Sequence, residues 1–260
     1  MANINPLLQH VPEEIVNETV RLCGVLFDDG CCSEFIQKLN IPGEKCLHMF
    51  MIKLLGYGII LMGSIVKLPQ VLKIFGAKSG VGLSLFGVLL ELMAITFTAS
   101  YSFRNNFPMS AWGECIALGA ETALIAYMIL WYDGHKAGAL SFLLMYTGII
   151  YALTHPLFPK DLVWYLQSSV VYLAVSGKLM QALKNYKAQH TGQLSALSAW
   201  AIFAGSLARI LTTIKETGDL LTTITFICSS CSNAVIATQV LWYWKSTQAF
   251  MEKGKKKKAN

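Results

Sequence analysis

The sequence predicts an all-α membrane protein, and its composition and the lengths of its apolar runs carry that prediction. The 260 residues are 54% hydrophobic and only 14% charged, which is too apolar for an ordinary soluble domain. The runs approach the ~20 residues that a helix needs to cross the hydrocarbon core. Seven spans are expected: residues 47–66, 81–100, 111–130, 139–153, 162–179, 194–214 and 220–242.

Basic residues predict the orientation of these spans. With a lumenal N-terminus, the cytosolic loops would hold seven lysines, against Arg104, Lys160 and Lys215 on the lumenal side, in agreement with the positive-inside rule. An odd number of spans then places the C-terminus in the cytosol. The first span is expected to direct insertion itself, because residues 1–20 lack the apolar run of a signal peptide.

The lysine-rich end of the chain fits the same topology. Lys257 and Lys258 resemble a dilysine retrieval signal, which implies residence in the endoplasmic reticulum and requires a cytosolic C-terminus. A solvated tail that touches anionic headgroups is the alternative explanation of this charge. Because the net charge of +6 is explained mostly by topology, nucleic acid is not expected as a partner.

Residues 1–46 form the predicted lumenal segment, which carries four cysteines. In an oxidising lumen one pair could bridge, and the favoured partner of Cys46 is Cys31 or Cys32. Spacing does not choose between these two, and Cys32–Cys46 stands as the candidate disulfide. Asn17 opens a glycosylation sequon that only a lumenal N-terminus could use. The alternative is four free thiols and an unmodified asparagine.

An internal duplication organises the chain. A shift of 111 residues superimposes nine positions, eight of them identical, and the matched pairs run from Lys67 on Lys178 to Ser84 on Ser195. A duplicated unit predicts two three-helix repeats joined by one linker helix, which makes the repeats parallel about an axis along the membrane normal. The expected parts are the lumenal segment 1–46, first repeat 47–131, linker 132–156, second repeat 157–244 and cytosolic tail 245–260.

The duplicated motif resembles that of a known family. Lys67-Leu68-Pro69-Gln70, followed by Ser79 and Gly82-Leu83-Ser84, is similar to the PQ-loop motif, which implies the fold of the SWEET and cystinosin proteins. In the second copy Met180 replaces the proline. Pro69, Gln70 and Gln181 are therefore candidate hinge residues, with an asymmetric role expected. The alternative is that a helix simply ends at the motif.

Further segments resemble a member of this family that is required for the use of dolichyl-phosphate mannose and glucose in lumenal glycosylation, which covers N-glycan precursors, O-mannose and GPI anchors. The segments are 66–71, 76–79, 105–108, 190–195, 205–210 and 216–219. The resemblance implies as partners the dolichyl-phosphate-linked sugars, membrane lipid and lumenal glycosyltransferases. Sequence does not indicate an oligomeric state.

Ionisable residues inside the spans are the candidate binding residues, because charges are rare there and mark pathways or sites. Arg209 is the candidate cation for a lipid-linked phosphate, since guanidinium matches phosphate geometry; a buried ion pair with Glu114 or Glu91 is the alternative. The other candidates for substrate binding are Glu91, Glu121, Asn233, Lys67 and Lys178, of which the two lysines could capture phosphate at the cytosolic mouth.

Three functions remain open at this level: translocation of the lipid-linked sugar, its presentation to transferases, and proton-coupled export of a small solute with Glu91 or Glu121 as the proton site. The sequence shows no nucleotide-binding glycine loop, nucleophile elbow or metal-binding helix pair. The protein is therefore not expected to be an enzyme, and no cofactor, metal or catalytic residue is expected.

Overall fold

The structure is a computed structural model. It describes residues 44–80, 83–191 and 196–250, except for the side chains of residues 197 and 198. It also describes eight positions nearer the N-terminus: Pro12, Glu14, Ile15, Glu18, Thr19, Cys23, Cys31 and Cys32. The chain divides into two compact units, Met1–Gly58 and Ile59–Asn260. The predicted glycosylation site, Asn17, lies outside the described residues.

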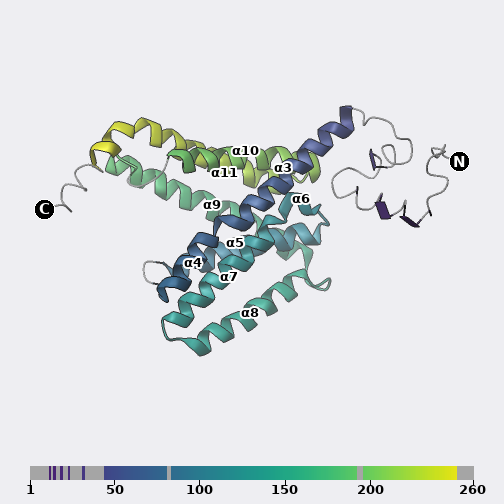
Figure 1. The fold of residues 1–260 in the computed structure, drawn as a ribbon, viewed down its shortest axis with the longest axis horizontal. Coiled ribbons are helices and arrows are strands. Elements are labelled where there is room, and N and C mark those ends of the chain that lie inside the picture. Colours follow the sequence, from purple (N-terminus) through teal and green to yellow (C-terminus); the bar gives the residue numbers. More distant parts are fainter. Residues whose placement is uncertain are drawn as a thin grey trace. The chain divides into compact units, whose positions relative to one another are not determined.

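The regular elements of the described residues are all helices (Figure 1). They are α3 (Glu44–Val66), α4 (Leu68–Ala77), α5 (Leu85–Arg104), α6 (Met109–Trp112), α7 (Glu114–Tyr132), α8 (Lys136–Thr154), α9 (Lys160–Ala188), α10 (Ala196–Glu216) and α11 (Leu220–Trp242). Five are long and apolar enough to cross a membrane: α3 with α4, α5, α7, α8 and α11. This agrees with an all-α membrane protein.

Two of the seven predicted spans do not meet that test. The helices α9 and α10 are 29 and 21 residues long, so length does not exclude a crossing. They are less apolar, because α9 carries charged residues at both ends and Lys178 within it, and α10 contains Arg209. That they cross the membrane, and with them the arrangement of seven spans, stays a prediction.

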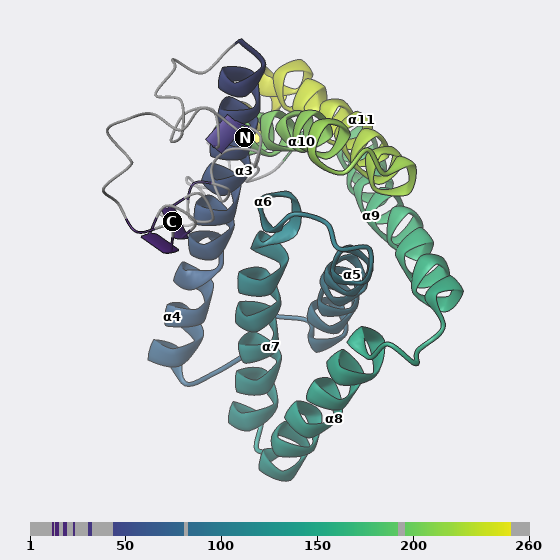
Figure 2. The same cartoon turned by 90° about the vertical axis from the view of Figure 1, so that its right-hand side faces the viewer.

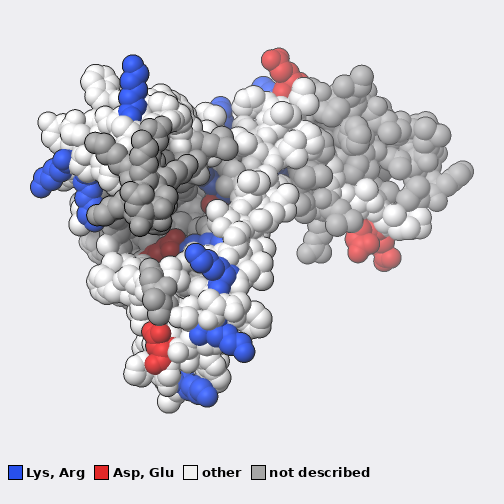
Figure 3. Space-filling model, turned by 60° about the vertical axis from the view of Figure 1, so that its left-hand side comes forward, with Lys and Arg blue, Asp and Glu red and all other residues white. Residues whose placement is uncertain are grey.

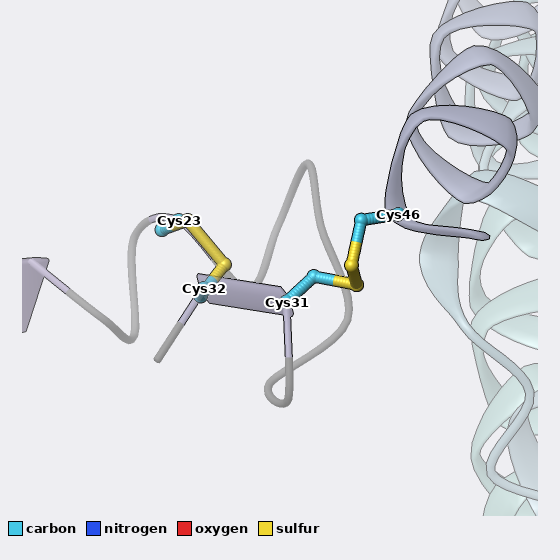
Figure 4. The surroundings of a disulfide bond; sticks show 4 residues. All are labelled: Cys23, Cys31, Cys32 and Cys46. Carbon is cyan, nitrogen blue, oxygen red and sulfur yellow. A yellow bond between two sulfur atoms is a disulfide. The ribbon is translucent and has the colours of Figure 1, made fainter. Parts of the chain in front are cut away.

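The N-terminal unit contains two disulfides rather than one (Figure 4). Cys31 bonds Cys46, and Cys23 bonds Cys32. The candidate pair Cys32–Cys46 was therefore wrong, while the other partner left open for Cys46 is the observed one. Cys31 and Cys32 are consecutive helical residues, whose side chains point about 100° apart. Only one of them can face Cys46, and the other is turned toward Cys23.

Helix boundaries depart from the predicted spans where capping decides them. Helix α5 begins at Leu85, four residues after its predicted start, because Ser84 is extended and its hydroxyl accepts a hydrogen bond from Gly87 N, as a helix cap does. Helix α9 continues to Ala188 and ends on Gln189 in the left-handed conformation. The second copy of the motif therefore lies inside a helix.

From Ile59 on, the two predicted repeats pack in the same order. In the first, α7 contacts both α4 and α5, and in the second, α11 contacts both α9 and α10. Figure 2 shows α7 between α4 and α5. The shift of 111 residues carries Leu85, the first residue of α5, onto Ala196, the first residue of α10. It also carries Met109, where α6 begins, onto Leu220, where α11 begins. The third helix of each repeat thus lies between the other two.

The main hydrophobic core belongs to the first repeat and the linker. It contains Leu92 of α5, Ile125 and Ile129 of α7 and Phe142 of α8. The linker helix α8 packs on α7 and α5, and α5 also contacts α9 of the second repeat. The helix α5 is therefore the element that joins the first repeat, the linker and the second repeat.

Candidate functional site

The first motif interrupts a helix without ending it. Lys67 alone separates α3 from α4, and Val71 N donates a hydrogen bond to Lys67 O at 3.0 Å. Pro69 lies in the first turn of α4, where a missing N–H costs little. The alternative that the helix simply ends at this motif was wrong. In α9, by contrast, Met180 and Gln181 lie in an unbroken helix.

A cavity of about 640 Å³ opens beside the first motif. Pro69, Gln70 and Lys73 line it from α4, and Ser79 and Leu83 line it from the following loop. The loop lies tightly on α7, because a Cβ atom on Gly80 would come within 3.2 Å of the backbone Cα of Ile129. The loop that follows α4 is thus in direct contact with α7.

Two candidate residues of the first repeat, Lys67 and Glu91, meet where α3 ends. Lys67 Nζ lies 2.6 Å from Glu91 Oε2 of α5 and donates a hydrogen bond to Thr122 Oγ1 of α7 at 2.8 Å. The side chain of Lys67 is 13% exposed and that of Glu91 51% exposed. The neighbouring Glu121 has a buried carboxylate oxygen that makes no hydrogen bond within the described part of the chain. Figure 3 shows acidic and basic side chains close to each other on one face of the molecule.

The equivalent positions of the second repeat have different chemistry. Lys178 is half-buried in α9, and no ion pair joins it to any residue that the structure describes. The shift of 111 residues places Asn233 of α11, which is 5% exposed, at the position of Thr122. Ile202 stands where the first repeat has Glu91. The second repeat therefore retains the lysine but not its acidic partner.

Arg209 of α10 lies at the opposite end of the helices. It is 4% exposed, forms an ion pair with Glu114 of α7, and donates hydrogen bonds from Nη1 to the carbonyls of Ser110 and Ala111 at 3.2 and 3.0 Å. The ion pair that sequence offered as an alternative for Arg209 is thus present. Gly63 of α3 leaves room for Glu114, because a Cβ atom at position 63 would lie only 2.8 Å from Glu114 Cβ.

Two further contacts join the repeats at this same end. Tyr101 Oη donates to Asp219 Oδ2 at 2.9 Å, and Ser110 Oγ donates to Glu216 Oε1 at 2.7 Å. Arg104 Nη2 also donates to Phe158 O at 2.8 Å, and between described residues of the two repeats from Ile59 on, all hydrogen bonds and ion pairs lie at this end. We call this set of contacts, with the Arg209–Glu114 pair, the polar latch.

Sequence reasoning missed most of the polar latch. Glu216 and Asp219 were noticed only as part of a family-like segment, and Tyr101 and Ser110 were not singled out. Aromatic and hydroxyl residues near the end of a span are common, so their residue types give no signal of a partner more than 100 positions away. A usable signal was present in Asp219, because its side chain caps α11 by accepting from Thr222 N and such caps are recognisable.

Comparison with known proteins supports a PQ-loop relationship. Residues 51–111 match the PQ loop repeat family. The human protein solute carrier family 66 member 3 is 26% identical over 181 residues, which cover 69% of this chain and 88% of that protein. No solved structure matches the chain. Among the described residues, no three His, Cys, Asp or Glu side chains gather where they could hold a metal ion.

Proposed function

We propose that this protein handles dolichyl-phosphate mannose, and dolichyl-phosphate glucose, in the endoplasmic-reticulum membrane by moving the sugar-phosphate head between the two repeats. The motif segments described above resemble those of the mannose-phosphate-dolichol utilisation defect protein, and this likeness supplies the substrate class. The PQ-loop match supports a membrane protein of the transporter-like kind.

One observation supports the mechanism: among the residues that the structure describes, the polar contacts between the repeats lie at one end. Two parallel repeats that rock about a central site would be held together on the closed side and separate on the open side. The polar latch supplies the closed side, and the opposite end has the charged residues Lys67, Glu91 and Lys178. With the N-terminus lumenal, the latch closes the lumenal side, and the open end faces the cytosol, where these donors are made.

The charges assign different roles to the three candidate cations. Arg209 is engaged by Glu114 and two backbone carbonyls, and Lys67 is engaged by Glu91 and Thr122. Lys178 is the half-buried cation with no acidic partner among the described residues, so it is our choice for the phosphate, with Asn233 and Glu121 available for sugar hydroxyls. A half-buried charge without an acidic partner is costly, which favours a ligand there.

A reconstitution experiment tests this proposal. Purified protein in vesicles with a labelled short-chain dolichyl-phosphate mannose analogue is expected to speed the appearance of the mannose head to an impermeant oxidant, relative to empty vesicles. Lys178→Met should remove the acceleration, whereas the matched control Lys187→Met, an exposed lysine of the same helix, should not. No acceleration by the unchanged protein would contradict translocation and favour presentation of the donor to lumenal glycosyltransferases.

A second function is favoured by the buried carboxyl of Glu121. Carboxyl groups without a cationic partner inside spans serve as proton relays, and the human relative is by its name a solute carrier. In this alternative the protein is a proton-coupled exporter of a small solute, similar to the cystinosin and SWEET proteins. Uptake of solute driven by a pH gradient and lost in Glu121→Gln would support it, and absence of any such uptake would exclude it.

Location and orientation belong to the same proposal. The Cys31–Cys46 and Cys23–Cys32 bonds fit an oxidising compartment, which favours a lumenal N-terminus and a cytosolic tail. Glycosylation of Asn17 in cells, read as a mobility shift that a glycosidase reverses, would support this orientation. Labelling of an introduced N-terminal cysteine tag from the cytosol in selectively permeabilised cells would contradict it.

A further inference from the structure

We propose that a groove between α5, α8 and α9 binds the isoprenoid chain of a lipid phosphate, with the phosphate at the end of the groove marked by Lys160 and Arg104. The groove is a cavity of about 500 Å³, within the ~300–1,000 Å³ of typical ligand sites. It lies apart from the cluster of Lys67, and the polar cavity at its end is lined by Tyr101 of the polar latch. The choice of an isoprenoid chain rests on the proposed function.

The lining of the groove fits a hydrocarbon chain. It is formed by leucine, methionine, phenylalanine, isoleucine and alanine side chains of the three helices, with Leu92 and Phe97 from α5, Met145 and Ala152 from α8, and Leu166 from α9. A chain that enters it loses no hydrogen bonds and gains van der Waals contacts with these side chains.

The polar atoms of the groove are already satisfied. Thr96 Oγ1 and Tyr146 Oη form a hydrogen bond with each other at 3.0 Å, and Thr96 Oγ1 also donates to Leu92 O at 2.7 Å. An occupant therefore has no polar partner to find at this depth. The groove selects an apolar chain rather than a sugar or a peptide, whose polar groups would be left unpaired.

One end of the groove leads to a small polar cavity of about 150 Å³. Both cavities are lined by α5 and α9. On α5, Phe97 lines the groove and Tyr101, one turn further, lines the polar cavity. On α9, Leu166 lines the groove and Val163 lines the polar cavity. The apolar and polar sites therefore lie next to each other along the same two helices. This is the arrangement that a lipid with a chain and a charged head requires.

The polar cavity has a cation for a phosphate. Lys160 and Arg104 line it, together with the carboxylate of Asp161. Arg104 already donates hydrogen bonds to backbone carbonyls, to His155 O and to Phe158 O at 2.8 Å. Lys160 is exposed at the first residue of α9, where the helix dipole also favours an anion. Lys160 is therefore the main phosphate contact, and Arg104 adds positive charge from its fixed position.

The position of the groove explains how a head could cross while its chain stays in lipid. Helix α5 belongs to the first repeat and α9 to the second, and α8 is the linker that packs on α5. Figure 2 shows α8 and α9 on different sides of α5. A head that leaves the space between the repeats at the latch end would meet Lys160, with its chain already placed in the neighbouring groove. With a lumenal latch, this is where lumenal transferases would collect the donor.

Photolabelling tests the groove without any transport measurement. The full chain in lipid nanodiscs is mixed with farnesyl phosphate that carries a diazirine on its chain, irradiated, and the labelled residues are mapped by mass spectrometry. Labels are expected on groove residues of α5 and α8. Ala152→Trp, which fills the groove, should lower labelling about tenfold, the loss of ~1.4 kcal/mol of binding. Gly148→Trp on the same helix, where a Cβ atom meets open space, should leave it unchanged.

The head site is tested by comparing charged and uncharged probes. Lys160→Gln is expected to weaken labelling by the phosphate probe while labelling by the matching isoprenol probe stays the same. Lys215→Gln, at the end of α10, is the matched control and should change neither. Equal effects of Lys160→Gln on both probes would overturn the assignment of the phosphate. Ile149→Trp gives a second groove-filling variant if Ala152→Trp does not fold.

A competition experiment shows which lipid occupies the groove. Unlabelled farnesyl phosphate should prevent labelling of the groove at concentrations where phosphatidic acid does not; if phosphatidic acid competes equally, the groove takes any acyl chain and the proposal is wrong. Labels scattered over α8, including the exposed Leu144, would also overturn it. Groove labelling without faster head crossing in vesicles would support the groove proposal and contradict translocation. Faster head crossing without groove labelling would support translocation and contradict the groove proposal.

Discussion

The two repeats have the same helix order but opposite internal chemistry. In the first, Ile74 of α4 and Met128 of α7 are both buried in the apolar core. At the equivalent positions, the second repeat has Asn185 and Gln239, whose side chains are hydrogen-bonded at 3.1 Å, and Gln239 also donates to Ala182 O at 2.9 Å. The second repeat is thus fixed by directional bonds where the first has adaptable packing.

The buried acidic and basic residues also differ between the repeats. The first repeat has the acids Glu91 and Glu114, where the second has Ile202 and Thr225, while the second contributes Arg209 at the position of Thr98. Each repeat therefore holds one half of the Arg209–Glu114 pair. The repeats are not interchangeable: the first has a broken helix at its motif, and the second has an unbroken one.

The largest expected effect comes from breaking the ion pair that joins the repeats. Arg209→Met should lower the free energy of unfolding by about 3–5 kcal/mol, because Glu114 would be left as a buried, unpaired charge. Thermal unfolding of the purified protein in detergent measures it. The double variant Arg209→Met with Glu114→Gln should recover most of the loss. No recovery would mean that Arg209 acts through its backbone contacts to α6 rather than through the pair.

Exchange of the motif residues between the repeats should have unequal effects. Met180→Pro places proline inside the unbroken helix α9 and should cost about 3 kcal/mol, since it removes a hydrogen bond and clashes with the preceding turn. Pro69→Met should change stability by less than about 1 kcal/mol, because position 69 lies in the first turn of α4. If the first motif is a hinge, Pro69→Met slows head crossing in vesicles. Equal costs at both positions would contradict the asymmetry.

Gly63 tests the close approach of α3 to α7. Gly63→Ala gives the first repeat the residue that the second has at the same position, Ala174, and should destabilise by about 1–3 kcal/mol through overpacking against Glu114. Gly177→Ala in α9, where a Cβ atom meets open space, should gain up to about 1 kcal/mol from helix propensity. Both values follow from unfolding curves, and a gain in both variants would show that α3 can shift away at no cost.

The smallest expected effect belongs to the amide pair of the second repeat. Gln239→Met, which introduces the residue of the first repeat, should cost about 1 kcal/mol, the scale of side-chain hydrogen bonds between membrane helices, because Asn185 loses its acceptor. Adding Asn185→Ile should restore stability, since the pair then matches Ile74 and Met128. A double variant less stable than the single one would show that the second repeat cannot accept apolar packing.

Part of the site could be predicted from the sequence because its signals are local. The polar candidates Lys67, Glu91 and Glu121 stand out against apolar spans at a depth set by the helix rise of ~1.5 Å per residue. Depth also placed Arg209 near Glu114, and the ion pair between them was foreseen as an alternative. Whether the candidate residues bind substrate stays a prediction.

Other parts could not be predicted, because they depend on how helices rotate about their axes. Depth does not tell which of two acids a lysine faces, so the contact of Lys67 with Glu91 and Thr122 needed the packed helices. The same holds for Cys31 and Cys32, which one helical step turns to different partners. Residues such as Tyr101 and Phe158, which line cavities, have ordinary types for a span end and give no signal by themselves.

The sequence by itself determined the class of protein, the apolar runs, the duplication at a shift of 111 residues and the place of the proline. These are properties of neighbouring residues. An apolar run favours burial regardless of which helix packs against it. Only the tertiary structure decided that the helix continues past the proline, that the polar contacts between repeats gather at one end and that an apolar groove lies between α5, α8 and α9. Those features arise from contacts between segments far apart in the chain, which residue order does not specify.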